Sequence, residues 1–347
     1  MPPRTVASYK DALAPYERAQ TRRGVIQIAN SLLPYLALTV ASYLTWGLSP
    51  LLTAVLAIIA AGFLVRTFVV FHDCSHGSLL PSRKGNARVG AVLGLFVLTP
   101  FAQWRHGHAI HHATSGDLDR RGVGDVLTLT VAEYHAQPWY GRLGYRLFRN
   151  PVVMFGLGPV FAMIILPRVA GIGPGARSRL RNSVLLNDAV LAGIVFALGS
   201  LLGWARFLEV WAPSALIAGA AGIWLFYVQH QFEDAYWASG EEWSYAEAAL
   251  AGSTHLKLPR LLAFFSADIG CHHVHHLNAK IPNYHLRAAH ASHPVFETVP
   301  TIGIADGMRA VRFKLWDADA GKLVTFAQAR RSQARARVAP TVVGAEA

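Results

Sequence analysis

Residues 24–65 read GVIQIANSLLPYLALTVASYLTWGLSPLLTAVLAIIAAGFLV, a run of 42 residues without a charged side chain. A helix that crosses a bilayer needs about 20 apolar residues, so this run predicts two membrane spans joined by a turn. The GLSP sequence at 47–50 supplies turn-forming residues near the middle of the run. A buried helical hairpin of a soluble protein is the alternative, but only 15% of the chain is charged, which is low for a soluble domain.

Four further apolar stretches follow, at 89–104, 150–167, 189–205 and 210–229. The stretch 89–104 is short for a span and contains Pro100, so we expect a re-entrant or interfacial helix there. Arginines precede and follow 150–167, which predicts a segment that dips into the membrane and returns to the same side. The sequence therefore predicts an all-α integral membrane protein with about four transmembrane helices, two re-entrant or interfacial helices and both termini in the cytoplasm.

The net charge of +12 is explained by basic residues in the loops that flank the apolar stretches. This is the distribution that the positive-inside rule predicts, and it argues against a nucleic-acid-binding protein. We divide the chain into a polar cytoplasmic segment at 1–23, a membrane domain at 24–328 and a basic tail at 329–347. The N-terminal segment does not resemble a cleavable signal peptide. The tail shows no apolar periodicity, and we expect it to be disordered or to lie on anionic headgroups.

Histidines are concentrated in three short clusters. The clusters are His72-Asp-Cys-Ser-His76, His108-Ala-Ile-His111-His112 and His272-His273-Val-His275-His276. Residues three and four apart on a helix share one face, so each cluster can direct its imidazoles at one point. Eight nitrogen donors result, whereas one zinc ion needs only three or four, so the clusters predict two metal ions side by side. Imidazole suits iron, copper, zinc and nickel, and the spacing does not choose among them.

Two other features bear on this centre. His230 ends the last apolar stretch at the depth of the clusters, which makes it a candidate ninth ligand; a lone histidine there is otherwise an interface residue. Soluble di-iron proteins use Glu-x-x-His, and no glutamate in this chain has a histidine three residues later. The metal shell is therefore expected to be almost entirely imidazole. Nearby carboxylates could orient the rings by accepting their free N–H groups; the candidates are Asp73, Asp117, Asp119 and Asp268.

The clusters resemble the three histidine boxes of the integral-membrane fatty acid desaturase family. The resemblance extends over roughly residues 30–325 and is nearest to the acyl-lipid, Δ12/ω-6-type branch. Other stretches that carry it are WRHGH at 104–108, GDV at 124–126 with Thr130 and Glu133-Tyr134, QHQFE at 229–233, Leu277 with IPNY at 281–284, and LWD at 315–317. Ser75 stands where the first box more often has glycine. Phe226 replaces an asparagine, a water-mediated ligand, of the acyl-CoA branch, which argues against an acyl-CoA substrate.

The resemblance implies a non-haem di-iron centre, with dioxygen as co-substrate. The implied ligands are His72, His76, His108, His111, His112, His272, His275 and His276, with His230 as the extra one. His106 and His273 occupy positions in the boxes that are not ligands in the family. The remaining histidines lie outside the boxes; they are His135, His255, His285, His290 and His293.

The implied reaction is the insertion of a double bond into a long acyl chain, expected to be linked to a membrane lipid. Two electrons would come from an external donor, a ferredoxin or a protein like cytochrome b5, docking on the arginine-rich face. We expect the protein in the bacterial inner membrane, with its boxes on the cytoplasmic side. A di-iron hydroxylase or ketolase acting on carotenoids or alkanes is the nearest alternative. A metal transporter or a haem electron-transfer subunit is the alternative of a different class. Haem ligation, however, requires histidines on facing spans at membrane depth, and these histidines are clustered at the ends of the apolar stretches.

Overall fold

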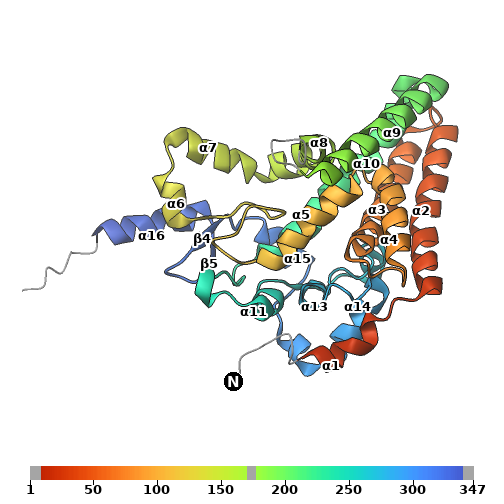
Figure 1. Cartoon of the computed structure of the whole chain (residues 1–347). Helices are drawn as coiled ribbons and strands as arrows, with labels where there is room; N and C mark the ends of the chain where they lie inside the picture. The colour runs from red at the N-terminus through yellow and green to blue at the C-terminus, as the bar shows by residue number, and fades with distance from the viewer. Residues whose placement is uncertain (1–8, 170–176, 339–347) are drawn as a thin grey trace, which may run out of the picture.

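The fold is that of a computed structural model, which describes residues 9–169 and 177–338. Four helices are long and apolar enough to cross a membrane, as the sequence predicts: α2 (Thr21–Leu44), α3 (Pro50–His76), α9 (Ser178–Leu202) and α10 (Trp204–His230). They stand side by side at the right of Figure 1, with the α2–α3 and α9–α10 turns at one end. The other end of this bundle meets a cap built from the rest of the chain.

The helices are longer than the apolar stretches that predict them. α9 begins at Ser178 rather than at 189, and α3 continues through the first histidine cluster to His76. Helix ends can extend past the hydrocarbon because backbone hydrogen bonding does not require apolar side chains. α3 has clear signals at both ends: Ser49 accepts a hydrogen bond from Leu52 at its start, with Pro50 in the first turn, and Gly77 has a left-handed backbone at its end.

Two helix pairs bend where the sequence predicts re-entrant or interfacial segments. α4 (Arg83–Phe96) and α5 (Phe101–Thr114) meet at 102° around Pro100, and Gly90 makes room there for the Phe101 ring. α7 (Trp139–Phe148) and the segment Val153–Val169 meet at 60°. That segment contains two π-helical stretches, η3 (Val153–Leu157) and η4 (Val160–Ile165), followed by α8 (Leu166–Val169).

The cap contains short helices and small sheets. Its helices are α1 (Lys10–Leu13), α6 (Val131–Ala136), α11 (Tyr245–Leu250), α12 (Arg260–Phe265), α13 (His272–Leu277), α14 (Asn283–His290) and α15 (Ile304–Ala310). In one sheet, β4 (Leu315–Asp317) pairs in parallel with β1 (Leu129–Thr130) and antiparallel with β5 (Lys322–Val324). In the other, β2 (His255–Leu256) runs parallel to β3 (Thr301–Ile302). One core cluster joins Tyr9 and Leu13 to Val274 and Phe296, so the start of the described chain packs into the cap.

Part of the basic tail is helical. α16 (Phe326–Val338) extends into the segment from 329, which the sequence predicts to be disordered or to lie on anionic headgroups. Alanine, arginine and glutamine are strong helix formers, so local propensity allows a helix without an apolar stripe. The part of the predicted tail from 339 to 347 lies outside the described residues.

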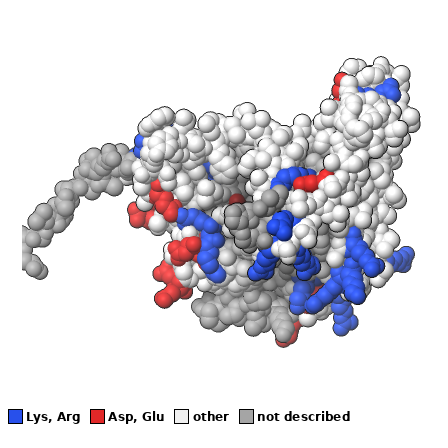
Figure 2. Space-filling model, turned by 45° about the horizontal axis from the view of Figure 1, so that its top comes forward, with Lys and Arg blue, Asp and Glu red and all other residues white. Residues whose placement is uncertain are grey.

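Charge is distributed unevenly over the surface. Figure 2 shows an upper part that is almost free of charged side chains, with lysines and arginines gathered below it. Exposed apolar side chains of the spans, such as Leu44, Leu51 and Leu201, are typical of a lipid-facing surface. The protein is therefore a membrane protein with an apolar bundle and a polar cap.

Candidate metal centre

The three histidine boxes lie at helix ends that converge beneath the bundle. The first box is in the last turn of α3, the second is in the last two turns of α5, and the third forms the short helix α13. His230 is the last residue of α10. The structure therefore brings together segments that are up to 204 residues apart, from His72 to His276.

The nine predicted histidines form two adjacent groups. In each group, one ring nitrogen from every histidine lies within 4.8 Å of those of the others. The five-histidine group is His72, His76, His108, His112 and His275. The four-histidine group is His111, His230, His272 and His276. Each box contributes to both groups except the first, which contributes only to the five-histidine group.

The ring nitrogens of the two groups are arranged to bind metal ions rather than to form hydrogen bonds with one another. Nε2 of His272 lies 2.9 Å from Nε2 of His230, and Nε2 of His275 lies 3.0 Å from Nε2 of His112. Nε2 atoms of His76, His111 and His276 are buried and lack a hydrogen-bond partner in the part of the chain that the structure describes. Buried polar atoms of this kind are costly without a partner, which metal ions would provide.

Burial also sets the charge of these imidazoles. It lowers the pKa of His272, His275 and His276 well below the usual value for histidine, and neighbouring histidines lower it further. A neutral imidazole is the form that binds a metal ion, because its second nitrogen has a free lone pair. The environment of the third box therefore keeps these histidines in the neutral form that binds a metal ion.

Each group has one carboxylate beside it. Oδ1 of Asp73 lies 3.3 Å from Nδ1 of His72, and its Oδ2 accepts a 2.6 Å hydrogen bond from the backbone N–H of Asn283. In the four-histidine group, Nδ1 of His111 is hydrogen-bonded to Oδ1 of Asp125. A carboxylate that accepts the Nδ1–H of histidine fixes the ring and leaves Nε2 free for a metal ion.

Asp125 was not among the carboxylates that we selected from the sequence. Its position depends on Gly124, which has φ of +73° and whose Cβ, if present, would lie 2.9 Å from the carbonyl oxygen of Gly107. This loop can therefore lie directly against α5. The GDV motif was the available signal, but a glycine-aspartate pair is also typical of an ordinary turn.

Three of the carboxylates that we did select contact other groups. Asp117 accepts hydrogen bonds from Arg120 and from the backbone N–H of Asp119. Asp119 accepts one from the backbone N–H of Gly240 at 2.8 Å, and Asp268 pairs with Arg287. These contacts stabilise loops of the cap, so for these three residues the predicted role of orienting histidines is not supported by the contacts found.

The other histidines lie outside both groups. His106 is exposed on α5. His273 points away from the centre, and its Nε2 lies 3.0 Å from Nδ1 of His290, close to the ring of His255. His135 is on α6, beside Tyr134. None of these histidines belongs to either group, as the resemblance implies.

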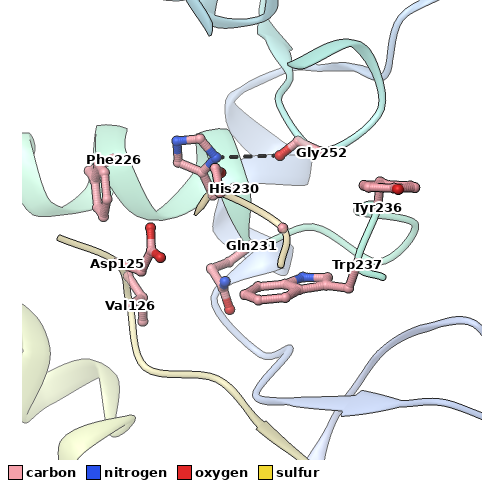
Figure 3. A pocket seen from close by; sticks show the side chains of 10 residues that line it. Asp125, Val126, Phe226, His230, Gln231, Tyr236, Trp237 and Gly252 are labelled. Carbon is pink, nitrogen blue, oxygen red and sulfur yellow. Dashed lines mark hydrogen bonds between the residues drawn. The ribbon is translucent and has the colours of Figure 1, made fainter. Parts of the chain in front are cut away.

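Aromatic rings cover the centre. The Trp104 indole stacks on His108, with ring centroids 4.3 Å apart. Phe226 lies one helical turn before His230 and contacts the rings of both His111 and His230, with centroids 5.2 and 5.3 Å apart. A small pocket lies beside the four-histidine group, between Asp125, Phe226 and His230 (Figure 3). Its interior has room for about one water molecule.

Comparison with known proteins places this arrangement in a family. The family model for fatty acid desaturases matches residues 14–305, which include all three boxes and His230. The chain belongs to the fatty acid desaturase family. A desaturase is an oxidoreductase, so the chain is an enzyme of that class.

Curated desaturases resemble the chain over much of its length. A fatty acid desaturase of Bacillus subtilis is 43% identical over 314 residues, which are 90% of this chain and 89% of the relative. An sn-1 oleoyl-lipid 12-desaturase of Synechocystis is 32% identical over 66% of this chain and 64% of the relative. An sn-1 acyl-lipid omega-3 desaturase (ferredoxin) of the same organism is 29% identical over 64% of this chain and 62% of the relative. The predicted membership of the fatty acid desaturase family is confirmed, and the relatives include desaturases named as oleoyl-lipid 12- and omega-6 enzymes.

Proposed function

We propose that this desaturase inserts a double bond into a long acyl chain of a membrane lipid, using two iron ions, dioxygen and two electrons from a separate protein. The observation that carries the proposal is the meeting of nine histidines in two adjacent groups, where membrane spans enter the cap. We propose the nine as the metal ligands. The family match disfavours a carotenoid or alkane hydroxylase and a transporter.

Iron is proposed because the reaction needs a redox-active metal and because the resemblance implies a di-iron centre. Two hydrogens leave adjacent CH₂ groups, and dioxygen takes up these two hydrogens, two electrons and two protons to form two molecules of water. A bound pair of iron ions would supply the redox chemistry that activates dioxygen. Zinc has no redox chemistry, and imidazole is a suitable donor for iron.

The chain's own residues would orient the ligands and exclude water. Asp73 and Asp125 each hold the Nδ1 side of one imidazole, so that Nε2 of His72 and of His111 is available to the metal. Trp104 and Phe226 cover the histidine groups with apolar rings. A site shielded from water protects a reactive oxidant from side reactions.

We propose an acyl-lipid substrate with Δ12-type regiochemistry. Support comes from the relative named as an oleoyl-lipid 12-desaturase and from Phe226 at the position of the acyl-CoA branch's asparagine. A lipid-linked chain can reach the centre from the bilayer because the histidines lie at the ends of α3 and α10.

We propose an acidic ferredoxin as the electron donor and the cytoplasmic side of the bacterial inner membrane as the location of the boxes. Two relatives carry ferredoxin in their names. The lysines and arginines below the apolar surface in Figure 2 would attract an acidic donor and would also favour the cytoplasmic side.

Expression in a bacterial host that is fed oleate tests the proposal. Gas chromatography with double-bond location should find a doubly unsaturated C18 chain in membrane lipid, and none in a host that expresses His275→Ala. Unchanged fatty acids together with oxidised carotenoids would assign the enzyme to the hydroxylase class instead. A new Δ9 bond in saturated chains would overturn the proposed regiochemistry.

A further inference from the structure

A patch of exposed basic side chains lies beside the first histidine box. The box is in the last turn of α3, and the loop 77–82 leads from there to the start of α4. Arg83 and Lys84 are in the first turn of α4, and Arg22 and Arg23 are in the first turn of α2. All four side chains are exposed, and none of them forms an ion pair within the described part of the chain. These four residues are called the basic patch below.

Contacts hold the start of α2 against the loop that follows α3. A Cβ on Gly24, next to Arg23, would lie 2.6 Å from the carbonyl oxygen of Leu79 in that loop. The Tyr284 hydroxyl donates a 3.1 Å hydrogen bond to the same carbonyl, and the Arg23 guanidinium lies 6.0 Å from the centre of the Tyr284 ring. The basic patch therefore flanks, from α2 and from α4, the loop that directly follows His76.

The segment that forms the patch has almost no negative charge to offset it. Between Glu17 and Asp117 the sequence contains eight lysines and arginines but a single acid, Asp73. Asp73 is 1% exposed, and both of its oxygens have partners inside the protein. Glu17 accepts a 2.7 Å hydrogen bond from Asn278. The patch therefore presents a positive potential to a molecule that approaches from solution.

The patch adjoins the histidine group that lies closer to the surface. In the five-histidine group, His76 and His108 are partly exposed, whereas every member of the four-histidine group is buried. His76 is followed directly by the exposed Gly77. Electron transfer becomes faster as the path through the protein shortens, so a donor bound at the end of α3 would reduce the centre through the first box.

Another path from the centre leads to a surface of opposite charge. The Tyr245 hydroxyl donates a 2.6 Å hydrogen bond to the carbonyl of His276, and the Trp243 ring lies 6.3 Å from the Tyr245 ring. The residues that precede Trp243 are Glu241 and Glu242, and both are exposed. Because like charges repel across an interface, an acidic protein would avoid this surface, and charge favours the basic patch instead.

We propose that the basic patch is the docking surface of the electron donor, an acidic iron–sulfur protein of the ferredoxin class. The inference rests on the proposed function, which requires an external donor, and adds the place at which that donor binds. Each reduced donor gives up one electron, so two donors bind in turn to reduce two ferric ions to two ferrous ions. The patch attracts the donor from solution and orients it over the end of α3.

Charge reversal tests the docking surface. Arg83→Glu/Lys84→Glu places two acids in the first turn of α4, where negative side chains are favourable for a helix, so the fold should persist. The matched control is Arg330→Glu/Arg331→Glu, which changes the net charge equally at two exposed positions. These positions are on α16, at the left of Figure 1, whereas α4 lies at the right. The pair of variants therefore separates the effect of the patch from that of net charge.

The measurement is the rate at which the enzyme oxidises a reduced donor. The full-length ferric protein, in discs of phosphatidylcholine, is mixed without oxygen with a chemically reduced acidic ferredoxin, and stopped-flow absorption follows the ferredoxin at several salt concentrations. Arg83→Glu/Lys84→Glu should slow the reaction at least about tenfold at low salt and much less at high salt, because salt screens the attraction. Arg22→Glu/Arg23→Glu should cause a similar loss, and the α16 variant should match the wild type.

The proposal is overturned if both patch variants react within about twofold of the wild-type rate, or if the α16 variant is slowed as much as they are. A patch variant with the wild-type rate whose melting temperature no longer rises with phosphatidylglycerol would assign the patch to lipid headgroups instead. Titration with dithionite examines the centre independently of docking, and every variant should take up two electrons per chain. Fewer than two in the wild type would reject the di-iron centre of the proposed function.

Discussion

Arg149 donates a 2.8 Å hydrogen bond from Nη2 to Oε1 of Gln231, the residue that directly follows His230. Its guanidinium is fully buried and also donates to the carbonyl of Leu127 at 2.7 Å and to the Tyr227 hydroxyl at 3.0 Å. The Arg149 side chain thus connects the end of α7 with Leu127, in the loop that contains Asp125, and with the end of α10.

Replacement of Arg149 by lysine should destabilise the protein strongly. A lysine cannot reproduce the forked geometry, so several buried acceptors lose their donor, at a cost of about 1–3 kcal/mol each. We expect a loss of at least about 3 kcal/mol in the free energy of unfolding, seen as a melting temperature lower by about 5 °C or more in detergent. Arg142→Lys, at a partly buried position of the same helix, is the control. Equal melting temperatures of the two variants would contradict the prediction.

Lys314 should make stability depend on pH. Burial, with a contribution from nearby Arg149, lowers the pKa of this lysine to about 7. The ammonium group lies over the Tyr227 ring and has no hydrogen-bond partner among the described residues. Between the folded pKa of about 7 and the ordinary value of 10.5, the unfolded chain binds more protons, so stability should rise with pH through this window.

The measurement is the melting temperature at a series of pH values above about 7. Lys314→Met should remove this part of the rise and stabilise the protein most at the lower end of the window. An unchanged slope in the variant would show that Lys314 does not titrate there.

His230 and His135 should behave differently when each is replaced by alanine. His230 is 7% exposed and belongs to the four-histidine group, whereas His135 lies on α6 outside both groups. His230→Ala should lower desaturation by more than about 100-fold, the upper end of what loss of an outer partner costs, and should reduce the bound metal below two ions. His135→Ala should keep both activity and metal. Similar losses in the two variants, by fatty acid chromatography and metal analysis, would reject His230 as a ligand.

Removal of metal should destabilise the protein. The buried ring nitrogens of the two groups face one another at about 3 Å, an arrangement that metal ions would stabilise in the folded state alone. A ligand present at 1,000 times its dissociation constant adds about 4 kcal/mol to the free energy of unfolding. We expect a chelator to lower the melting temperature and iron(II) to restore it. His275→Ala should respond less to both; a chelator effect of equal size would indicate stabilisation elsewhere.

The sequence predicted the parts of this structure that depend on local pattern. The uncharged run at 24–65 and the spacing of the boxes each act within one or two helices, so apolar length and helical periodicity were sufficient. Asp125 could not be identified in the same way, because its contact with His111 depends on how the loop at Gly124 packs against α5. The division into five and four histidines likewise depends on how α5 and α13 cross, since His111 and His112 fall into different groups.

The apolar face of α7 should lie in the interfacial region of the membrane. Trp139, Tyr140, Leu143 and Leu147 are 48–70% exposed on this helix, while Tyr145 and Arg149 on its other side pack against the protein. Burial of that face in lipid would be favourable by roughly 25 cal/mol per Å² of apolar area. The helix would then connect the lipid surface to the metal centre through Arg149 and Gln231.

Spin labels on single cysteines in liposome-reconstituted protein test this placement. The native cysteines, Cys74 and Cys271, are buried and free, so they should not react in the folded protein. Labels at Leu143 and Leu147 should be accessible to dissolved oxygen and protected from a water-soluble nickel reagent. A label at Glu241, exposed in the cap, should show the reverse. If the nickel reagent reaches Leu143 and Leu147 as readily as Glu241, α7 faces water, and its apolar side chains must be covered in another way.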